Sequence, residues 1–222
     1  MDRFSFTLLS DGSSDRALIP IMTWVLQHHG QIPLAQGQWA DLGVLRARVT
    51  DLAERMRLAL ELYPCELLCV HRDAEKQEPQ LRYQEVGDAW RRLNGKVSTV
   101  PLLCVVPVRM QEAWLLSDEG AIRTAAGNPR GKEPLSLPGV EKLESLADPK
   151  EVLHTALRRA SGLTGRRLKT FDPRRHCLRV AEFAAEGGFA SLLATAAFQR
   201  LVADVATLKD RNWGRPVTRG GA

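Results

Sequence analysis

The chain has 222 residues, of which 44% are hydrophobic and 26% charged, values that are ordinary for a soluble globular protein and do not indicate disorder. A net charge of +5 and a pI of about 9.3 are compatible with a polyanionic partner without identifying one. The sequence contains no run of about 18 apolar residues and no secretory signal pattern, so we expect a cytoplasmic protein with no membrane contact.

The first half of the chain alternates between strand-like and helix-like segments. Residues 3–10 are rich in Phe, Thr and Leu and end at an Asp-Gly turn, which is typical of a strand, and Ser13 or Ser14 can cap the helix that follows. Further strands are expected at 31–39, 66–71 and 97–108, and further helices at 42–62 and 81–93. This alternation predicts an α/β fold with a mostly parallel sheet of about four strands flanked by helices.

The second half of the chain is predicted to be helical. A helix is expected at 111–126, and a stretch rich in Gly and Pro then breaks regular structure. Beyond it the apolar spacing indicates helices only, near 141–146, 150–160, 177–185 and 189–209. We therefore expect an α/β domain over 1–126, a loop over 127–139, a helical region over 140–213 packed on that domain, and a tail over 214–222.

The four cysteines show no C-x-x-C spacing, and three of them lie in or beside apolar, strand-like runs. This distribution favours buried free thiols over a disulfide framework or a zinc site. The cysteines are Cys65, Cys69, Cys104 and Cys177.

Four acidic residues follow two of the predicted strands. Asp11 and Asp15 come after the first strand, and Asp73 and Glu75 come after the strand at 66–71. Ligands of parallel α/β sheets bind beyond the carboxyl ends of the strands, where these acids are expected to converge. Clustered carboxylates usually need a cation, and oxygen ligands suit Mg²⁺ or Mn²⁺. The joint placement therefore predicts a metal site, although each acid taken singly is also an ordinary turn, helix-start or loop residue.

Three short segments carry a family resemblance: DGSSD at 11–15, RDAE at 72–75 and PVRMQEAWLLSD at 107–118. Together they resemble the DUF4276 family, whose sheet is similar to the TOPRIM fold of topoisomerases, primases and OLD-type nucleases. The resemblance covers roughly residues 4–118, about half of the chain. It implies a TOPRIM-like domain.

The resemblance also implies roles for particular residues. Asp11 stands where TOPRIM proteins carry a Glu after the first strand, Asp15 matches their second acid, and Asp73 with Glu75 matches their Asp-x-Asp. Asp11 is one methylene shorter than Glu, and Glu75 is one methylene longer than Asp. These two departures either compensate around one metal or mark a weakened site. Catalytic roles are implied for Asp11, Asp73 and Glu112.

Several neighbours of the acids have two interpretations. Glu112 starts the helix after the third strong strand, where it either lines the site or only interacts favourably with the helix dipole. Arg72 and Arg109 follow strands and either bind a scissile phosphate or pair with the acids.

The stretch 158–179 carries eight basic residues against a single acid. Such a one-sided run favours a phosphate-rich partner, whereas the alternatives are a solvated surface or contact with an acidic protein. Few aromatic residues occur there, so stacking on bases is poorly supported. The candidate phosphate-binding residues in this stretch are Arg166, Arg167, Lys169, Arg174 and Arg175.

The leading hypothesis is a metal-dependent phosphodiesterase, a nuclease that acts on DNA or RNA. The first alternative is a non-catalytic TOPRIM-like subunit that binds nucleic acid or a partner protein. The resemblance implies an ATPase partner and a role in anti-phage defence, and the chain has no G-x-x-x-x-G-K-[ST] segment of its own. The second alternative, a phosphotransfer or receiver-like domain, needs a Lys at a strand end, and no suitable Lys occurs.

Overall fold

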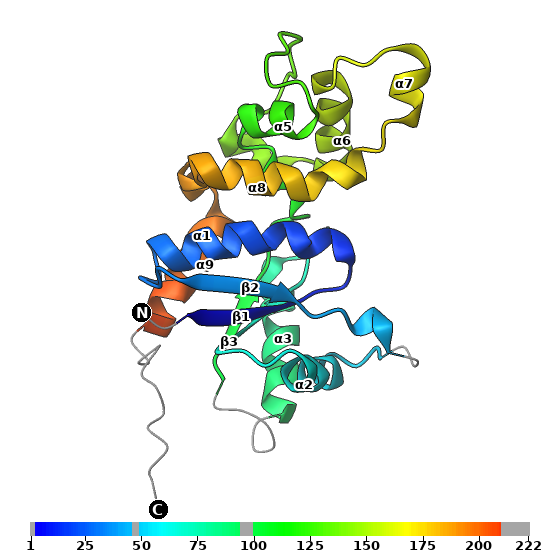
Figure 1. The fold of residues 1–222 in the computed structure, drawn as a ribbon. Coiled ribbons are helices and arrows are strands. Elements are labelled where there is room, and N and C mark those ends of the chain that lie inside the picture. The colour runs from blue at the N-terminus through cyan, green and yellow to red at the C-terminus, as the bar shows by residue number, and fades with distance from the viewer. Residues whose placement is uncertain (1–2, 46–48, 94–99, 210–222) are drawn as a thin grey trace, which may run out of the picture.

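The computed structural model describes residues 3–45, 49–93 and 100–209, and the predicted tail at 214–222 lies outside these ranges (Figure 1). Its centre is one parallel sheet of four strands in the order β2-β1-β3-β4. The strands are β1 (Phe4–Leu9), β2 (Ala35–Trp39), β3 (Leu67–His71) and β4 (Leu102–Val105). The predicted α/β fold with a parallel sheet of about four strands is therefore confirmed.

Two hydrophobic layers cover the faces of the sheet, because successive side chains of a strand point to opposite sides. Leu67 and Cys69 of β3 face a core shared with α1 (Leu18–His28), whereas Leu68 and Val70 face a second core. Helices α2 (Leu52–Leu62) and α3 (Pro79–Leu93) form that second layer, on the opposite side of the sheet from α1 (Figure 1).

Helix α1 lies close over β2, and the contact depends on a glycine. A Cβ added to Gly37 would lie 2.4 Å from the ring of Phe6 and 2.7 Å from Ile19. Only a residue without a side chain fits there.

The predicted helix at 42–62 is wrong in its first half. Leu42–Val44 is a single 3-10 turn, α2 begins only at Leu52, and residues 46–48 lie outside the described ranges. The Asp51 carboxylate accepts a hydrogen bond from the Glu54 backbone N–H at 2.9 Å, which fixes the new helix start.

The predicted helix at 111–126 is two helices, α4 (Glu112–Leu115) and α5 (Glu119–Ala125). The break lies at Asp118, whose carboxylate caps α5 by accepting a hydrogen bond from the Ala121 N–H at 2.9 Å. The predicted helix at 189–209 is likewise divided, into the 3-10 turn Ala190–Ala194 and helix α9 (Ala196–Lys209). Residues 97–99 of the predicted strand at 97–108 lie outside the described ranges, and of its remaining residues only Leu102–Val105 form a strand, β4.

The helical half shares its hydrophobic core with the sheet. Helix α9 packs against β4 and α1, and Phe198 meets Trp114 edge-on with ring centroids 5.3 Å apart. The remaining elements are the 3-10 turns Val140–Ser145 and Pro173–His176 and the helices α6 (Pro149–Ala160), α7 (Gly165–Thr170) and α8 (Cys177–Gly187). Helix α7 lies in a segment for which the sequence predicted no helix.

Two further expectations concern the whole chain. All four cysteines are free thiols, as predicted. Among the described residues, no helix is long and apolar enough to cross a membrane.

Candidate active site at the carboxyl edge of the sheet

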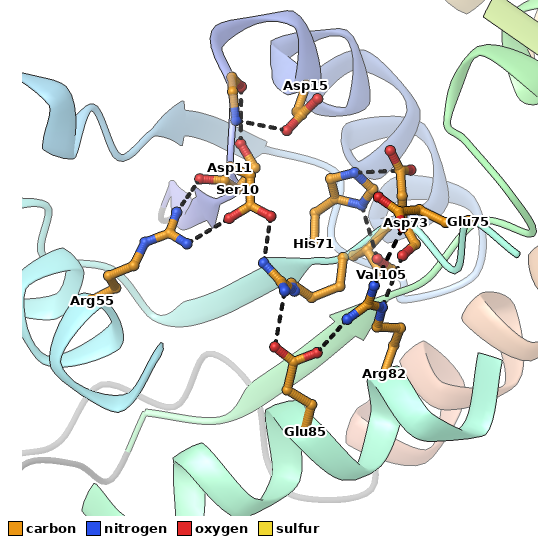
Figure 2. A network of polar contacts seen from close by, with 12 residues as sticks. Ser10, Asp11, Asp15, Arg55, His71, Asp73, Glu75, Arg82, Glu85 and Val105 are labelled. Carbon is orange, nitrogen blue, oxygen red and sulfur yellow. Dashed lines mark hydrogen bonds and ion pairs between the residues drawn. The ribbon is translucent and has the colours of Figure 1, made fainter. Parts of the chain in front are cut away.

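The register of the sheet brings the predicted acids to one edge. Leu9 of β1 lies beside Val70 of β3, and Val70 lies beside Cys104 of β4. The residues that follow these strands therefore leave the sheet side by side, as Figure 2 shows for Asp11, His71 and Asp73.

Asp15 is buried and firmly held. It is only 8% exposed, and its carboxylate accepts hydrogen bonds from the Gly12 N–H and the Ser14 hydroxyl, both at 3.1 Å. A third bond, at 2.8 Å, comes from the side-chain amide of Gln111, which lies 96 residues further along the chain. Asp15 thus links the turn after β1 to the segment after β4.

Asp73 lies on the other side of Gln111 and pairs with a buried histidine. The Gln111 backbone N–H donates to the Asp73 carboxylate at 3.1 Å, and His71 Nε2 lies 3.3 Å from the same oxygen. His71 Nδ1 is 3.0 Å from the Val105 carbonyl oxygen (Figure 2). Burial lowers the pKa of His71, but the hydrogen bond to Asp73 and the charges of Asp73 and Asp15 outweigh burial, so the pKa is raised overall. Since both neighbours of the ring are acceptors, the environment favours the doubly protonated imidazolium.

Glu112 is, with Asp15, a buried carboxyl group of this edge, whereas the side chain of Asp73 is 30% exposed. Glu112 is 6% exposed at the start of α4, between the buried side chains of Gln111 and Ala113. Burial raises the pKa of Glu112, and the negative charges of Asp73 and Asp15 raise it further, against the lowering effect of Lys150. We call Asp15, Asp73 and Glu112 the acid cluster, because three separate segments of the chain bring these carboxyl groups within electrostatic reach of one another.

Asp11 and Glu75 belong to a different network. Asp11 is exposed and forms ion pairs with Arg72 and, at 2.5 Å, with Arg55. The Glu75 carboxylate lies 3.8 Å from Arg82. Both arginines of the 72–82 stretch also pair with Glu85, each at 2.9 Å, which joins these side chains into one chain of contacts (Figure 2).

An open cavity of about 740 Å³ adjoins this network. Asp11, Arg55 and Arg72 provide its charged lining, and Leu42, Leu45 and Val49 provide its apolar lining. Two guanidinium groups beside open space form a natural site for a phosphate group.

The backbone beside Asp73 adopts an unusual conformation. Glu75 and Arg109 have φ values of 54° and 63°, in the left-handed region that side chains disfavour. The Glu75 N–H donates to the Arg109 carbonyl at 2.9 Å, so the two strained residues hold each other in place. Such strain, about 1–3 kcal/mol for each residue, is typical of functional edges.

The donor types fit a hard divalent cation, but the spacing does not. Within residues 3–45, 49–93 and 100–209, no three His, Cys, Asp or Glu side chains are arranged to hold a metal ion. Asp11, Asp15, Asp73 and Glu75 are instead each engaged by a hydrogen-bond or ion-pair partner. One atom does point to a missing ligand, since Gln111 Oε1 is buried beside Asp15 and accepts no hydrogen bond.

The predicted phosphate-binding residues of the second half lie apart from the strand ends, on α7 and on the turn Pro173–His176. Asp172 pairs with two of them, Arg174 at 3.3 Å and Arg175 at 3.7 Å. Arg166, Arg167 and Lys169 are exposed on α7.

Sequence reasoning missed several residues of this edge. Gln111 was read only as part of a motif, and Arg55, Arg82 and Glu85 stood in helices with no sign of their partners. His71 is the last residue of the predicted strand at 66–71, and no pattern in the sequence indicated its contact with Asp73. No family model, curated protein or solved structure matches this chain. The arguments about function therefore rest on the geometry of this edge and on the motifs.

Proposed function

We propose that this chain hydrolyses phosphodiester bonds in nucleic acid at the carboxyl edge of its sheet. The observation that carries the proposal is the acid cluster, in which Asp15, Asp73 and Glu112 converge from three segments and Glu112 has a raised pKa. A perturbed, buried carboxyl group at a strand-end edge is a mark of catalytic sites.

The cavity lined by Arg55 and Arg72 supplies the phosphate-binding part of the proposed reaction. Asp11 forms ion pairs with both guanidinium groups, and Arg72 also pairs with Glu85. A phosphate group offers them the same kind of charge-assisted hydrogen bonds and would compete with Asp11 for them. This gives Asp11 the role of a placeholder for the anion.

Glu112 has the properties of a proton donor. Burial raises the pKa of Glu112, which favours its protonated form relative to an exposed glutamate, so we assign it the donation of a proton to the leaving oxygen. His71 holds the Asp73 carboxylate in position through the contact of its Nε2 atom.

Mg²⁺ or Mn²⁺ is implied by the DUF4276 resemblance, and such an ion would supply an activated water and offset negative charge. Asp15 and Asp73 offer oxygen donors of the type it prefers, but no three His, Cys, Asp or Glu side chains of the described ranges are arranged to hold it, so the roles proposed for Glu112, Arg55 and Arg72 do not depend on the ion.

A second candidate function is a non-catalytic subunit that binds nucleic acid. It is favoured by the engagement of Asp11 with two arginines and by the lack of a preformed metal group in the described ranges. An ATPase partner and a role in anti-phage defence follow from the DUF4276 resemblance alone.

The two candidates differ in metal binding and in turnover. We expect wild type to bind Mn²⁺ in a calorimetric titration and to cleave labelled DNA or RNA with Mg²⁺ or Mn²⁺. The Asp15→Asn, Asp73→Asn double variant should do neither. Equal cleavage by both proteins would refute the catalytic assignment, and strand binding without metal binding or cleavage would establish the non-catalytic subunit.

A further inference from the structure

A second pocket lies in the helical half of the protein. Its volume is about 540 Å³, and its walls come from α6, α7 and the turn Pro173–His176. We call it the basic pocket, because four of its lining residues are cations and only one is an acid. The cations are Lys150, Arg158, Lys169 and Arg174, and the acid is Asp172.

The positive charge of the basic pocket is only partly compensated. Arg158 lies 3.6 Å from Glu151, and Arg174 shares the single carboxylate of Asp172 with Arg175. Several cations around one cavity repel one another unless an anion joins them. Phosphate suits such a cavity, because its oxygens accept hydrogen bonds from arginine and lysine together.

A buried histidine in the wall lacks a partner. His154 is 8% exposed, lines the basic pocket, and has a ring nitrogen, Nε2, with no hydrogen-bond partner. Buried polar atoms are normally hydrogen-bonded, so the unpaired nitrogen indicates a missing ligand at this point. Burial and the charges of Lys150, Arg158 and Arg174 lower the pKa of His154, although Glu151 acts in the opposite direction. The lowered pKa favours a neutral ring with one N–H to donate.

Lys150 connects the basic pocket to the acid cluster. It lines the pocket, and its positive charge acts on Glu112, whose pKa it lowers. Helix α6 carries Lys150 and packs both on α4, which carries Glu112, and on the turn that carries Arg174. Helix α6 therefore contacts both the helix that carries Glu112 and one wall of the basic pocket, so a strand held in the pocket would extend along α6 towards the acid cluster.

We infer that the basic pocket binds a backbone phosphate of the nucleic-acid strand that is presented to the acid cluster. The identity of the ligand rests on the proposed function, whereas the pocket itself stands on its four cations and on the unpaired nitrogen of His154. Arg166, Arg167 and Arg175 are exposed outside the pocket and extend the positive surface. This extension suits a strand better than a free mononucleotide.

Two neighbouring arginines provide a matched pair of variants. Arg174 lines the basic pocket and Arg175 does not, although both are exposed and both pair with Asp172. Arg174→Gln and Arg175→Gln remove the same charge from adjacent positions, and neither removes a buried side chain. A difference between them therefore reports the pocket rather than the overall charge.

Binding is measured in EDTA, where no metal-dependent cleavage occurs, with short fluorescein-labelled DNA and RNA strands and with AMP as the mononucleotide probe. We expect Arg174→Gln to weaken strand binding about tenfold, which is the loss of one charge-assisted hydrogen bond, and Arg175→Gln to weaken it less than about threefold. AMP should bind far more weakly than the strands.

Equal weakening by the two variants, or no strand binding by wild type, would refute the proposal that the basic pocket binds a phosphate of the strand. AMP binding as tight as strand binding would overturn the assignment of the ligand to a strand. Failure of the proposed function looks different, because wild type would then show the expected ranking in EDTA and still cleave nothing when Mg²⁺ or Mn²⁺ is added.

Discussion

Replacing Glu112 by Gln tests whether repulsion between the carboxylates of the acid cluster lowers the stability of the folded protein. Glu112 is 6% exposed, and burial together with the charges of Asp73 and Asp15 raises its pKa. A carboxyl group whose pKa is raised in the folded state contributes stability that is fully present below its unfolded pKa, about 4.3, and is lost as pH rises through the folded pKa. Glutamine keeps the shape and stays neutral at every pH.

The unfolding free energy of Glu112→Gln should therefore rise relative to that of wild type as the pH increases. Within the window between the unfolded and folded pKa values of Glu112, the difference in unfolding free energy increases by up to about 1.4 kcal/mol for each pH unit. For a protein of this size, 1 kcal/mol corresponds to a shift of about 2–4 °C in Tm. Above the folded pKa the advantage becomes constant.

Thermal unfolding of both proteins between about pH 4 and pH 8 measures this difference directly. The control is Glu75→Gln, since Glu75 is exposed and lies 3.8 Å from a single arginine, Arg82. We expect the control to stay within about 0.5 kcal/mol of wild type at every pH. A Glu112→Gln advantage that does not change with pH, or that shrinks as pH rises, would refute the coupling of Glu112 to the cluster.

Two further predictions concern packing and phosphate binding. Gly37→Ala should lower the unfolding free energy by about 1–3 kcal/mol in denaturant titrations, because its Cβ would overlap the Phe6 ring. The control is Gly87→Ala on α3, whose Cβ would meet no atom within 4 Å and which should leave the unfolding free energy unchanged or raise it by up to about 1 kcal/mol. Similar values for the two variants would argue against the close approach of α1 to β2. Arg72→Gln should weaken binding of labelled strands about tenfold while costing about 1–2 kcal/mol in stability, since Arg72 pairs with exposed Asp11 and with partly exposed Glu85. Unchanged affinity would remove Arg72 from the phosphate site.

The sheet was predictable from local patterns. Residues 67–70 form an unbroken apolar run, which is typical of a central strand covered on both faces, and the structure buries these four and His71. The placement of Asp11 and Asp73 after parallel strands likewise follows from strand order alone. Local patterns therefore predict the secondary-structure elements and the edge of the sheet at which their side chains lie.

The partners of those side chains were not predictable in the same way. Gln111 binds Asp15 across 96 residues, and Arg55 binds Asp11 across 44 residues. The sequence near either acid therefore does not predict its partner. These long-range contacts decide that Asp15, and not Asp11, is buried beside Asp73.

Some errors had signals that were present in the sequence. Asp51 is followed three residues later by Glu54, which is the pattern of a helix start, and Asp118 has the same function before α5. Continuous apolar spacing over 42–62 and 111–126 concealed both breaks. Helix α7 was missed because its six residues contain a single large apolar side chain, Leu168, and so show no amphipathic period.

Cleavage of labelled DNA and RNA by Asp73→Asn and Glu75→Gln, side by side with wild type in Mg²⁺ or Mn²⁺, tests the central claim most directly. The two acids are two residues apart, yet Asp73 touches His71 and Gln111 whereas Glu75 is exposed. The acid cluster predicts that Asp73→Asn loses at least about a hundredfold in rate and that Glu75→Gln stays close to wild type. Equal rates for Asp73→Asn and wild type, or an equal loss in both variants, would contradict it.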